Sequence, residues 1–329
     1  MFNANAMFTT FCKSIEQNVW YRVLLISVTI LLLVSAHNKI QRLKTPVPYS
    51  GSFMESFISS GSSSSSSNVV VKKDADTKDA FYAAVYNQLF NQKVDNAYEV
   101  GAIMNKYPAI SNQTVALDVG AGTGAYMNAF IQKGITNITG IETSADMIAQ
   151  AKKAHGQNLN IVQGDPTVPS AFSPSTFTLV SMMNFEVYYI PNTEQLFSNI
   201  YAWLKPGGYF VLHLVDPHKF NPSSLLGGGG TTTTTSSTRT HAQTAVKLND
   251  FEYKSDVQLF PNDMVQYMEV FTHDKTGKVR KNVRNFKIPS PQSFIELATG
   301  VGFNMLGQID LVKAQKEYQY FYLFYKPAS

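Results

Sequence analysis

The sequence has little cysteine, little charge and no cluster of charges of one sign. Cys12 is the single cysteine among 329 residues, which excludes an internal disulfide framework and a cysteine-based metal cluster. Charged residues make up 15% of the chain and the formal net charge is +4. Without a dense run of lysine or arginine, a nucleic-acid-binding surface is not predicted. Hydrophobic residues reach 44%, so the chain can build the core of one large domain or two small ones.

One long apolar run lies near the start of the chain. Residues 23–36 carry no charge, and together with residues 18–22 they approach the roughly 20 apolar residues of a membrane-spanning helix. We expect a tail over 1–17 and a single-pass transmembrane helix over 18–36. The alternative is a cleaved signal peptide, because Val34-Ser35-Ala36 resembles a cleavage site. More positive charges follow the run than precede it, which favours a cytosolic location for the rest of the chain.

Two stretches of low complexity follow the apolar run. Residues 37–77 are rich in serine and include GSSSSSS, a composition typical of a flexible linker. The folded domain is therefore expected over 78–329. A second stretch, SSLLGGGGTTTTTSSTRT over 223–240, is predicted to be a mobile loop inside that domain, because patterned sequence resumes after it.

Within 78–329, short apolar runs alternate with helical patterns. Strands are expected over 115–119, 138–141, 159–162, 177–183 and 209–215, and helices over 81–107, 125–133, 144–155 and 193–204. Strands separated by helices of this length predict a parallel α/β sheet with helices on both faces. Residues 251–288 contain strand-like stretches around a turn at 274–277 and predict an antiparallel insertion. A helix from Pro291 to about 300 and strands over 304–312 and 318–325 complete the domain.

The stretch LDVGAGTG follows the first expected strand and opens a helix. Gly120, Gly122 and Gly124 allow tight turns and the close approach of a ligand, and the helix start offers free N–H groups. The stretch also fits loosely the pyrophosphate-binding loop of NAD(P)-dependent oxidoreductases. Asp118 just before the loop counts against a pyrophosphate, because like charges repel, and favours a cationic ligand.

Two further acids end the next two expected strands. Glu142 can accept two hydrogen bonds from a ribose diol. Asp165, in VQGD, can accept a hydrogen bond from an adenine amino group. Acids at three successive strand ends, with a glycine loop at the first, favour an adenosine that carries a positively charged amino acid.

This set of motifs resembles the class I S-adenosylmethionine-dependent methyltransferases over residues 81–326. The resemblance rests on LDVGAGTG, ITGIETS, VQGD, FTLVSMMNFEVYYIPN and LKPGGYFVLHLV in this order. It implies a Rossmann-like methyltransferase fold with a seven-stranded sheet of order 3-2-1-4-5-7-6, whose seventh strand is antiparallel. Thr178 departs from the family pattern, which commonly has an aspartate there.

The resemblance also implies S-adenosyl-L-methionine as the cofactor and assigns residues to it by position. The implied cofactor-binding residues are Asp118, Gly120, Ala121, Gly122, Gly124, Glu142, Thr143, Met147, Asp165 and Asn184. Glu186, Tyr188 and Tyr189 are expected to line the acceptor pocket. Possible general bases are Glu186, His213, Asp216 and His218, with no catalytic residue assigned. No metal site is expected, because no set of ligands has a suitable spacing.

We therefore expect a membrane-anchored S-adenosylmethionine-dependent methyltransferase with a cytosolic domain. Its acceptor, a small molecule, a lipid or a protein, and its oligomeric state are not specified by the sequence. Two alternatives remain open at this point. One is an NAD(P)-dependent oxidoreductase with a Rossmann fold, and the other is a non-enzymatic, membrane-tethered binding module.

Overall fold

A computed structural model describes Ser27 and residues 68–90, 93–225, 233–237, 240–248 and 250–328. Contacts divide the chain into residues 1–50 and residues 51–329, and the fold below is that of the second unit. The predicted anchor over 18–36, except Ser27, and most of the predicted linker lie outside the described residues. Of the helices that the structure does describe, none is both long and apolar enough to cross a bilayer.

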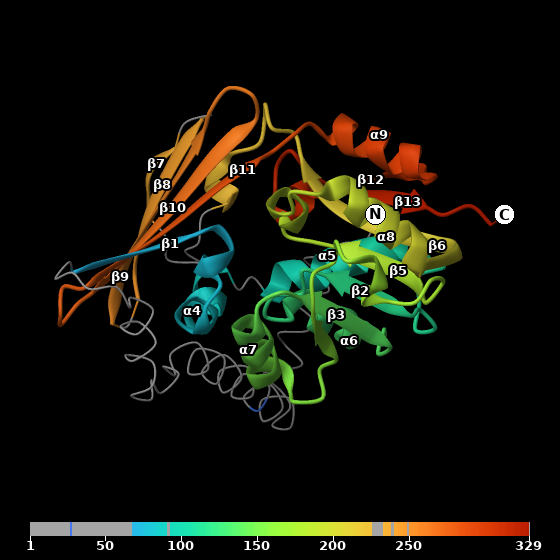
Figure 1. The fold of residues 1–329 in the computed structure, drawn as a ribbon, viewed down its shortest axis with the longest axis horizontal. Helices are drawn as coiled ribbons and strands as arrows, with labels where there is room; N and C mark the ends of the chain where they lie inside the picture. Colours follow the sequence, from blue (N-terminus) through green and yellow to red (C-terminus); the bar gives the residue numbers. More distant parts are fainter. Residues whose placement is uncertain are drawn as a thin grey trace, which may run out of the picture. The chain divides into compact units, whose positions relative to one another are not determined.

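A seven-stranded sheet forms the centre of the unit (Figure 1), in the order β12-β13-β6-β5-β2-β3-β4. Its strands are β2 (Ala116–Val119), β3 (Ile138–Glu142), β4 (Ile161–Gln163), β5 (Phe177–Met182), β6 (Leu204–Val215), β12 (Asn304–Asp310) and β13 (Gln319–Tyr325). The strands β2 to β6 pair in parallel, and β13 is antiparallel to both of its neighbours. Counted within this sheet alone, the order is 3-2-1-4-5-7-6 with an antiparallel seventh strand, so the expected topology is confirmed.

Helices cover both faces of this sheet. They are α5 (Lys93–Lys106), α6 (Ala125–Gln132), α7 (Ala145–His155), α8 (Thr193–Trp203) and α9 (Pro291–Val301). Side chains of α5, α6 and α7 share one core cluster, and those of α8 and α9 share another. Neighbouring strand residues such as Ala116 and Leu117 belong to different clusters. Both faces are thus buried, as is usual for a parallel sheet.

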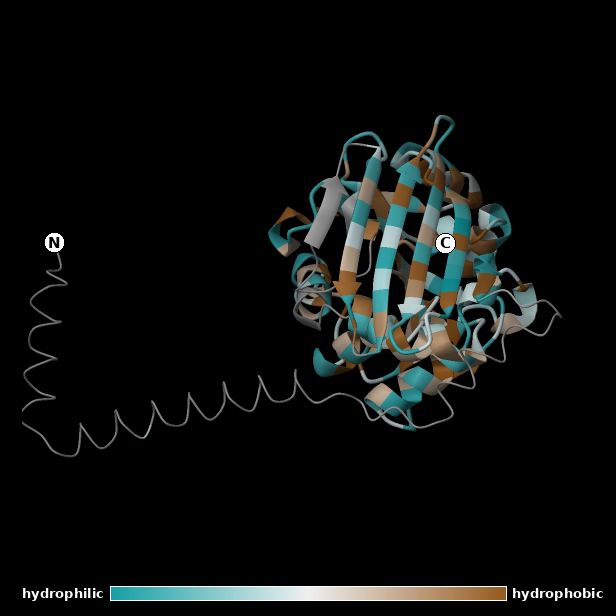
Figure 2. Ribbon diagram, turned by 90° about the vertical axis from the view of Figure 1, so that its left-hand side faces the viewer, coloured by the Kyte–Doolittle hydropathy of each residue, from teal (hydrophilic) through white to brown (hydrophobic). Residues whose placement is uncertain are grey.

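A second, six-stranded sheet has the order β1-β11-β10-β9-β8-β7. Its strands are β1 (Val69–Lys73), β7 (Thr233–Ser237), β8 (His241–Lys247), β9 (Phe251–Leu259), β10 (Met264–His273) and β11 (Val279–Lys287). Buried and more exposed residues alternate along β8 to β11, so one face of the sheet is packed and the other is not. Figure 2 shows the mixture of polar and apolar residues along these strands. Residues 251–288 form the antiparallel strands β9, β10 and β11, and the chain turns between β10 and β11 after His273.

Three expected boundaries were wrong. The strand β1 and a 3-10 helix over Asp74–Thr77, η1, lie in the expected linker, because the β-branched run VVV pairs with β11. The strand β7 lies in the expected mobile loop, where its threonines pair with β8. The single helix expected over 81–107 is two helices, α4 (Ala80–Phe90) and α5.

The two sheets share one core. The larger core cluster contains Leu212 of β6 together with Val257 and Phe286 of the second sheet. Phe81 and Tyr82 of α4 pack with Phe271 and other residues of the second sheet. The second sheet therefore provides the surface against which α4 and η1 are packed beside the parallel sheet (Figure 1).

Candidate active site

The three glycines after β2 have left-handed backbones but different surroundings. Their φ angles are +72° at Gly120, +54° at Gly122 and +75° at Gly124, a region that glycine adopts without strain. A Cβ on Gly124 would lie 2.7 Å from Leu159 Cδ2, whereas one on Gly122 would meet nothing closer than 3.8 Å. A Cβ on Gly120 would lie 2.1 Å from Glu186 Cγ. Gly124 thus serves helix packing, a Cβ on Gly122 would make only ordinary van der Waals contacts, and Gly120 is covered by Glu186.

Glu142 lies directly against this loop. Its side chain is 1% exposed, and its Oε2 accepts a hydrogen bond from the N–H of Gly122 at 3.0 Å. Its Oε1 accepts from the N–H of Ser144 at 3.0 Å and from the Thr143 hydroxyl at 3.2 Å. Ser144 in turn caps α7 by accepting from the N–H of Met147. These bonds hold an oriented carboxylate at the mouth of the loop, where it can bind hydroxyl groups.

Asp118 lies within the sheet rather than at its edge. Its side chain is buried, and its Oδ1 accepts a hydrogen bond from the Ser181 hydroxyl of β5 at 2.8 Å. Burial raises the pKa of Asp118 to about 7, although the bond from Ser181 acts in the opposite direction. Its charge at neutral pH is therefore sensitive to a nearby cation.

Two further predicted cofactor residues, Asp165 and Asn184, lie in turns after β4 and β5, whereas Met147 lies in the first turn of α7. Asp165 is exposed, and its Oδ1 accepts hydrogen bonds from the N–H and the hydroxyl of Thr167, at 2.8 and 2.7 Å. Asn184 and Phe185 are consecutive left-handed residues, with φ of +50° and +66°. The side-chain amide of Asn184 donates to the Tyr86 hydroxyl at 3.4 Å. Two strained residues in sequence at the end of β5 are typical of a functional turn.

The residues expected to line the acceptor pocket differ in burial. Tyr188 is 5% exposed, packs within the core, and its hydroxyl accepts a hydrogen bond from the N–H of Val215 at 3.0 Å. These contacts give Tyr188 a packing role, and its place in the acceptor pocket stays a prediction. Tyr189 is half-buried, with its ring centroid 4.6 Å from that of Phe286 and 5.7 Å from the guanidinium carbon of Arg284.

Sequence analysis missed Lys78, which lies between the two acids closest to the loop. Its Nζ is 3.3 Å from Glu186 Oε1 and 3.9 Å from Glu142 Oε1. Burial alone would lower the pKa of Lys78, but the two carboxylates outweigh burial and raise it. Burial raises the pKa of Glu186, and Lys78 offsets part of that rise. No local pattern marks this lysine, since its partners are distant in sequence.

The other suggested bases are less suited to that role. His213 is 1% exposed, and neither ring nitrogen has a hydrogen-bond partner among the described residues. Burial, assisted by the charge of Lys316, lowers the pKa of His213 to about 3, so it is a weak base at neutral pH. Asp216 accepts from the backbone N–H of His218 at 3.0 Å and pairs with Lys219, which places both residues in the turn after β6.

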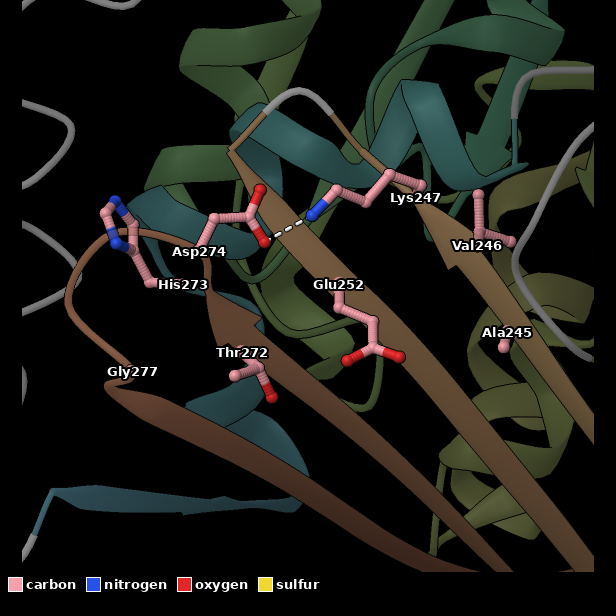
Figure 3. A pocket seen from close by; sticks show the side chains of 8 residues that line it. All are labelled: Ala245, Val246, Lys247, Glu252, Thr272, His273, Asp274 and Gly277. Atoms are coloured by element: carbon pink, nitrogen blue, oxygen red, sulfur yellow. Dashed lines mark hydrogen bonds and ion pairs between the residues drawn. The ribbon is translucent and has the colours of Figure 1, made fainter.

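A hollow lies on the antiparallel sheet, away from the glycine loop (Figure 3). It has a volume of about 510 Å³ and is lined by residues of β8, β9 and β10 and of the turn after β10. Lys247 and Asp274 point toward one another across it and form an ion pair. None of the predicted site residues lines this hollow. Within the described ranges, no three His, Cys, Asp or Glu side chains are grouped so that they could hold a metal ion.

The sequence family described as a methyltransferase domain matches residues 116–208. Over this stretch the chain is similar to methyltransferase domains. The match runs from β2 into β6 and includes the glycine loop, Glu142 and Glu186, whereas Lys78 and the second sheet lie outside it. No curated protein is significantly similar to the chain in sequence.

Solved structures share the fold of this methyltransferase domain at low sequence identity. An S-adenosylmethionine-dependent methyltransferase from Clostridium acetobutylicum has a TM-score of 0.54 at 17% identity, covering 75% of this chain and 98% of its own. An amino pentose methyltransferase from Micromonospora echinaspora has a TM-score of 0.54 at 16% identity, covering 75% and 97%. A sugar N-methyltransferase from Streptoalloteichus has a TM-score of 0.55 at 15% identity, covering 81% and 98%.

Proposed function

We propose that this chain transfers the methyl group of S-adenosyl-L-methionine to an acceptor bound beside Glu186 and Tyr189. The observation that carries the proposal is the buried carboxylate of Glu142, which is hydrogen-bonded to the N–H of Gly122 and lies against the glycine loop. A ribose diol is the ligand group that suits such a carboxylate. Glu186 adds a carboxylate beside Gly120, and a cationic ligand would favour the charged form of Asp118, whereas a pyrophosphate would not.

The residues present fit this cofactor. Gly122 is not closely covered by side chains, since an added Cβ would make only ordinary van der Waals contacts, with Met147 Cε at 3.8 Å. Glu142 would hold the ribose, flanked by Thr143 and Met147, and the loop from Gly120 to Gly124 would hold the methionine part. Asp165 and Asn184 stay predicted contacts of the adenine and of the reacting groups. When bound, the cofactor supplies a methyl group on a positively charged sulfur, so the protein has mainly to position the acceptor.

Calorimetric titration of the full chain with S-adenosylmethionine, S-adenosylhomocysteine and NAD tests this proposal. We expect both sulfur-containing ligands to bind, NAD not to bind, and Glu142→Ala to weaken binding by about tenfold or more, since hydrogen bonds to a carboxylate are lost. Glu252→Ala on β9, also a Glu-to-Ala change, is the control. Binding of NAD alone would support the oxidoreductase, and binding of no ligand would support the non-enzymatic module.

Amino sugars are the first acceptors to test. Solved neighbours include an amino pentose methyltransferase and a sugar N-methyltransferase, and Glu186 offers a carboxylate to an amine. Release of S-adenosylhomocysteine in the presence of a panel of amino sugars, with neutral sugars as controls, measures this activity. Release with neutral sugars only would exclude an amine acceptor.

We also propose that residues 18–36 anchor the chain in a membrane with the methyltransferase domain on the cytosolic side. The support is the uncharged run over 23–36 and its flanking positive charges. Alkaline carbonate extraction of membranes from cells that express the full chain tests the anchor. The chain should stay in the pellet, and Leu32→Arg should release it. A shortened mature chain in the soluble fraction would instead support the cleaved signal peptide.

A further inference from the structure

The loop that the proposed function assigns to the cofactor is covered by an ion pair of the chain itself. The side chain of Glu186 lies on Gly120, where an added Cβ would be 2.1 Å from its Cγ and 2.6 Å from its Cδ. Lys78 donates hydrogen bonds to both carboxylate oxygens of Glu186, at 3.3 and 3.5 Å. The same ammonium group is 3.9 Å from Glu142. Two acids of the proposed site thus share one lysine.

Lys78 is held at this position from both sides. Ser144, which follows Glu142 at the end of β3, donates its hydroxyl hydrogen bond to the carbonyl of Lys78 at 2.6 Å. Arg280 of β11 is fully buried and donates to the carbonyl of Thr77 at 3.2 Å and to Asp79 Oδ2 at 2.8 Å. The residues on either side of Lys78 are therefore fixed to the second sheet. A lysine that simply extended into solvent would not need hydrogen bonds to fix the backbone on both sides of it.

Most charged groups beside the loop are acids, so a carboxylate on the ligand would need a positively charged partner. A ligand whose ribose binds Glu142 and whose remainder follows the loop over Gly120 meets Glu186 and Lys78. S-adenosylmethionine and S-adenosylhomocysteine carry a carboxylate on that remainder, and the carboxylates of Glu142 and Glu186 would repel it. The ammonium group of Lys78 contacts both of these acids. It is thus the group suited to pair with a ligand carboxylate.

We propose that Lys78 binds the carboxylate of the cofactor, and that Glu186 is an internal carboxylate that occupies Lys78 until the cofactor arrives. The proposal rests on the proposed function, because it assumes that the cofactor binds at this loop. Lys78 then exchanges one carboxylate for another, which keeps its charge paired throughout. Glu186 leaves Gly120 in the same step and is then free to contact the methyl acceptor. The carboxylate of Glu186 therefore becomes available to the acceptor only after the cofactor has bound.

Calorimetry with two ligands on the full chain tests this exchange. S-adenosylhomocysteine carries the carboxylate, whereas 5′-methylthioadenosine has the same adenosine and sulfur but no amino acid. Lys78→Met should weaken the binding of S-adenosylhomocysteine by about 10- to 100-fold, the range for one hydrogen bond between charged groups. The same substitution should change the affinity for 5′-methylthioadenosine by less than about threefold. Glu186→Gln should have the opposite effect and raise the affinity for S-adenosylhomocysteine, because a neutral Gln side chain competes less well than a carboxylate for Lys78.

Matched controls separate these effects from changes in net charge or folding. Lys254 and Glu252 form an exposed ion pair on β9, with nitrogen and oxygen 2.9 Å apart, so Lys254→Met and Glu252→Gln repeat both charge changes away from the loop. Neither control should alter the affinity for either ligand. The melting temperature of each variant, measured without ligand, verifies that the fold is intact.

Each outcome decides the proposal. Equal weakening of both ligands by Lys78→Met would show that Lys78 only supports the structure. Weaker binding of S-adenosylhomocysteine by Glu186→Gln would show that Glu186 holds the cofactor and does not compete with it. If the unchanged chain binds neither ligand, the proposed function itself fails, and the exchange fails with it. If it binds both with the same affinity in every variant, the proposed function stands and only the exchange is overturned.

Discussion

Asp118 and Glu142 are both buried acids beside the glycine loop, but they differ in what compensates their charge. Glu142 accepts hydrogen bonds from two backbone N–H groups and one hydroxyl. For Asp118 the structure shows the Ser181 hydroxyl as donor, and burial raises its pKa to about 7. Several donors stabilise the charged form of a carboxylate, whereas burial with one neutral donor favours the protonated form.

The raised pKa of Asp118 predicts that stability falls as the pH rises from about 4 to about 7. In this window the unfolded chain loses the proton of Asp118 before the folded chain does, so ionisation favours unfolding. Asp118→Asn should remove much of this slope and be more stable than the parent at pH 8 by a few kcal/mol. Urea unfolding at pH 5 and pH 8 measures both effects. An unchanged slope in the variant would assign the titration to another group.

Gly124 and Gly300 predict opposite effects of the same substitution. Gly124→Ala should lower the free energy of unfolding by about 1–3 kcal/mol, because φ is +75° and the new Cβ would lie 2.7 Å from Leu159. Gly300 is exposed in α9, and an added Cβ would meet nothing within 4 Å. Gly300→Ala should raise stability by about 0.5–1 kcal/mol. Thermal and urea unfolding of the two variants give the comparison, and equal signs would contradict it.

At the scale of elements, β11 connects the second sheet to the site. Its buried face carries Arg280, which holds the chain around Lys78, and Arg284, which donates to Glu269 Oε2 at 2.6 Å. Glu269 is fully buried and also accepts hydrogen bonds from the hydroxyls of Tyr82, Tyr253 and Tyr267. The ring of Tyr82 belongs to α4, so one network joins β10, β11 and α4.

The pair of Arg284 and Glu269 predicts a compensating double substitution. Arg284→Met leaves the buried charge of Glu269 without its cation and should cost about 3–5 kcal/mol of stability. Adding Glu269→Gln removes that charge and should restore at least half of the loss. Urea unfolding of the two single variants and the double variant measures the coupling. Additive losses in the double variant would show that the two side chains do not act as a pair.

At the scale of the whole described unit, the two sheets are joined by one core. Phe286 of β11 is 7% exposed and belongs to the same cluster as Leu212 of the central sheet and Trp203 of α8. Its ring packs on that of Tyr189, which follows β5. Because this core is continuous, we expect the two sheets to unfold together as one cooperative unit.

Phe286→Ala should therefore destabilise both sheets together, by about 3–5 kcal/mol. Fluorescence of Trp203, in a background with Trp20→Phe, reports on the core beside α8, and far-ultraviolet circular dichroism reports on all strands. The two transitions should coincide in the parent and in the variant. A fluorescence transition that stays in place while part of the circular dichroism signal moves would show that the second sheet unfolds on its own.

The sequence by itself determined the parallel sheet and the position of the glycine loop, and its resemblance to class I methyltransferases implied the order of the strands. The sheet and the loop follow from short-range patterns: apolar runs at regular spacing, glycines directly after a strand, and acids at strand ends. Because parallel strands bring their carboxyl ends to one edge, the spacing already implied that the loop and Glu142 would lie together. The antiparallel segment over 251–288 was predictable for a similar reason, since its turn signal is local.

Only the tertiary structure decided what surrounds the loop. Lys78 meets Glu186 across 108 positions of sequence, and Arg280 reaches Thr77 across 203. Partners this distant leave no periodic pattern, so β1, η1 and Lys78 fell at the edge of an expected linker. Tyr188 and Tyr189 are neighbours in sequence, yet one packs in the core and the other lies beside Arg284. Tyr188 packs on Phe294 of α9 and Tyr189 on Phe286 of β11, and the local sequence does not encode partners this distant.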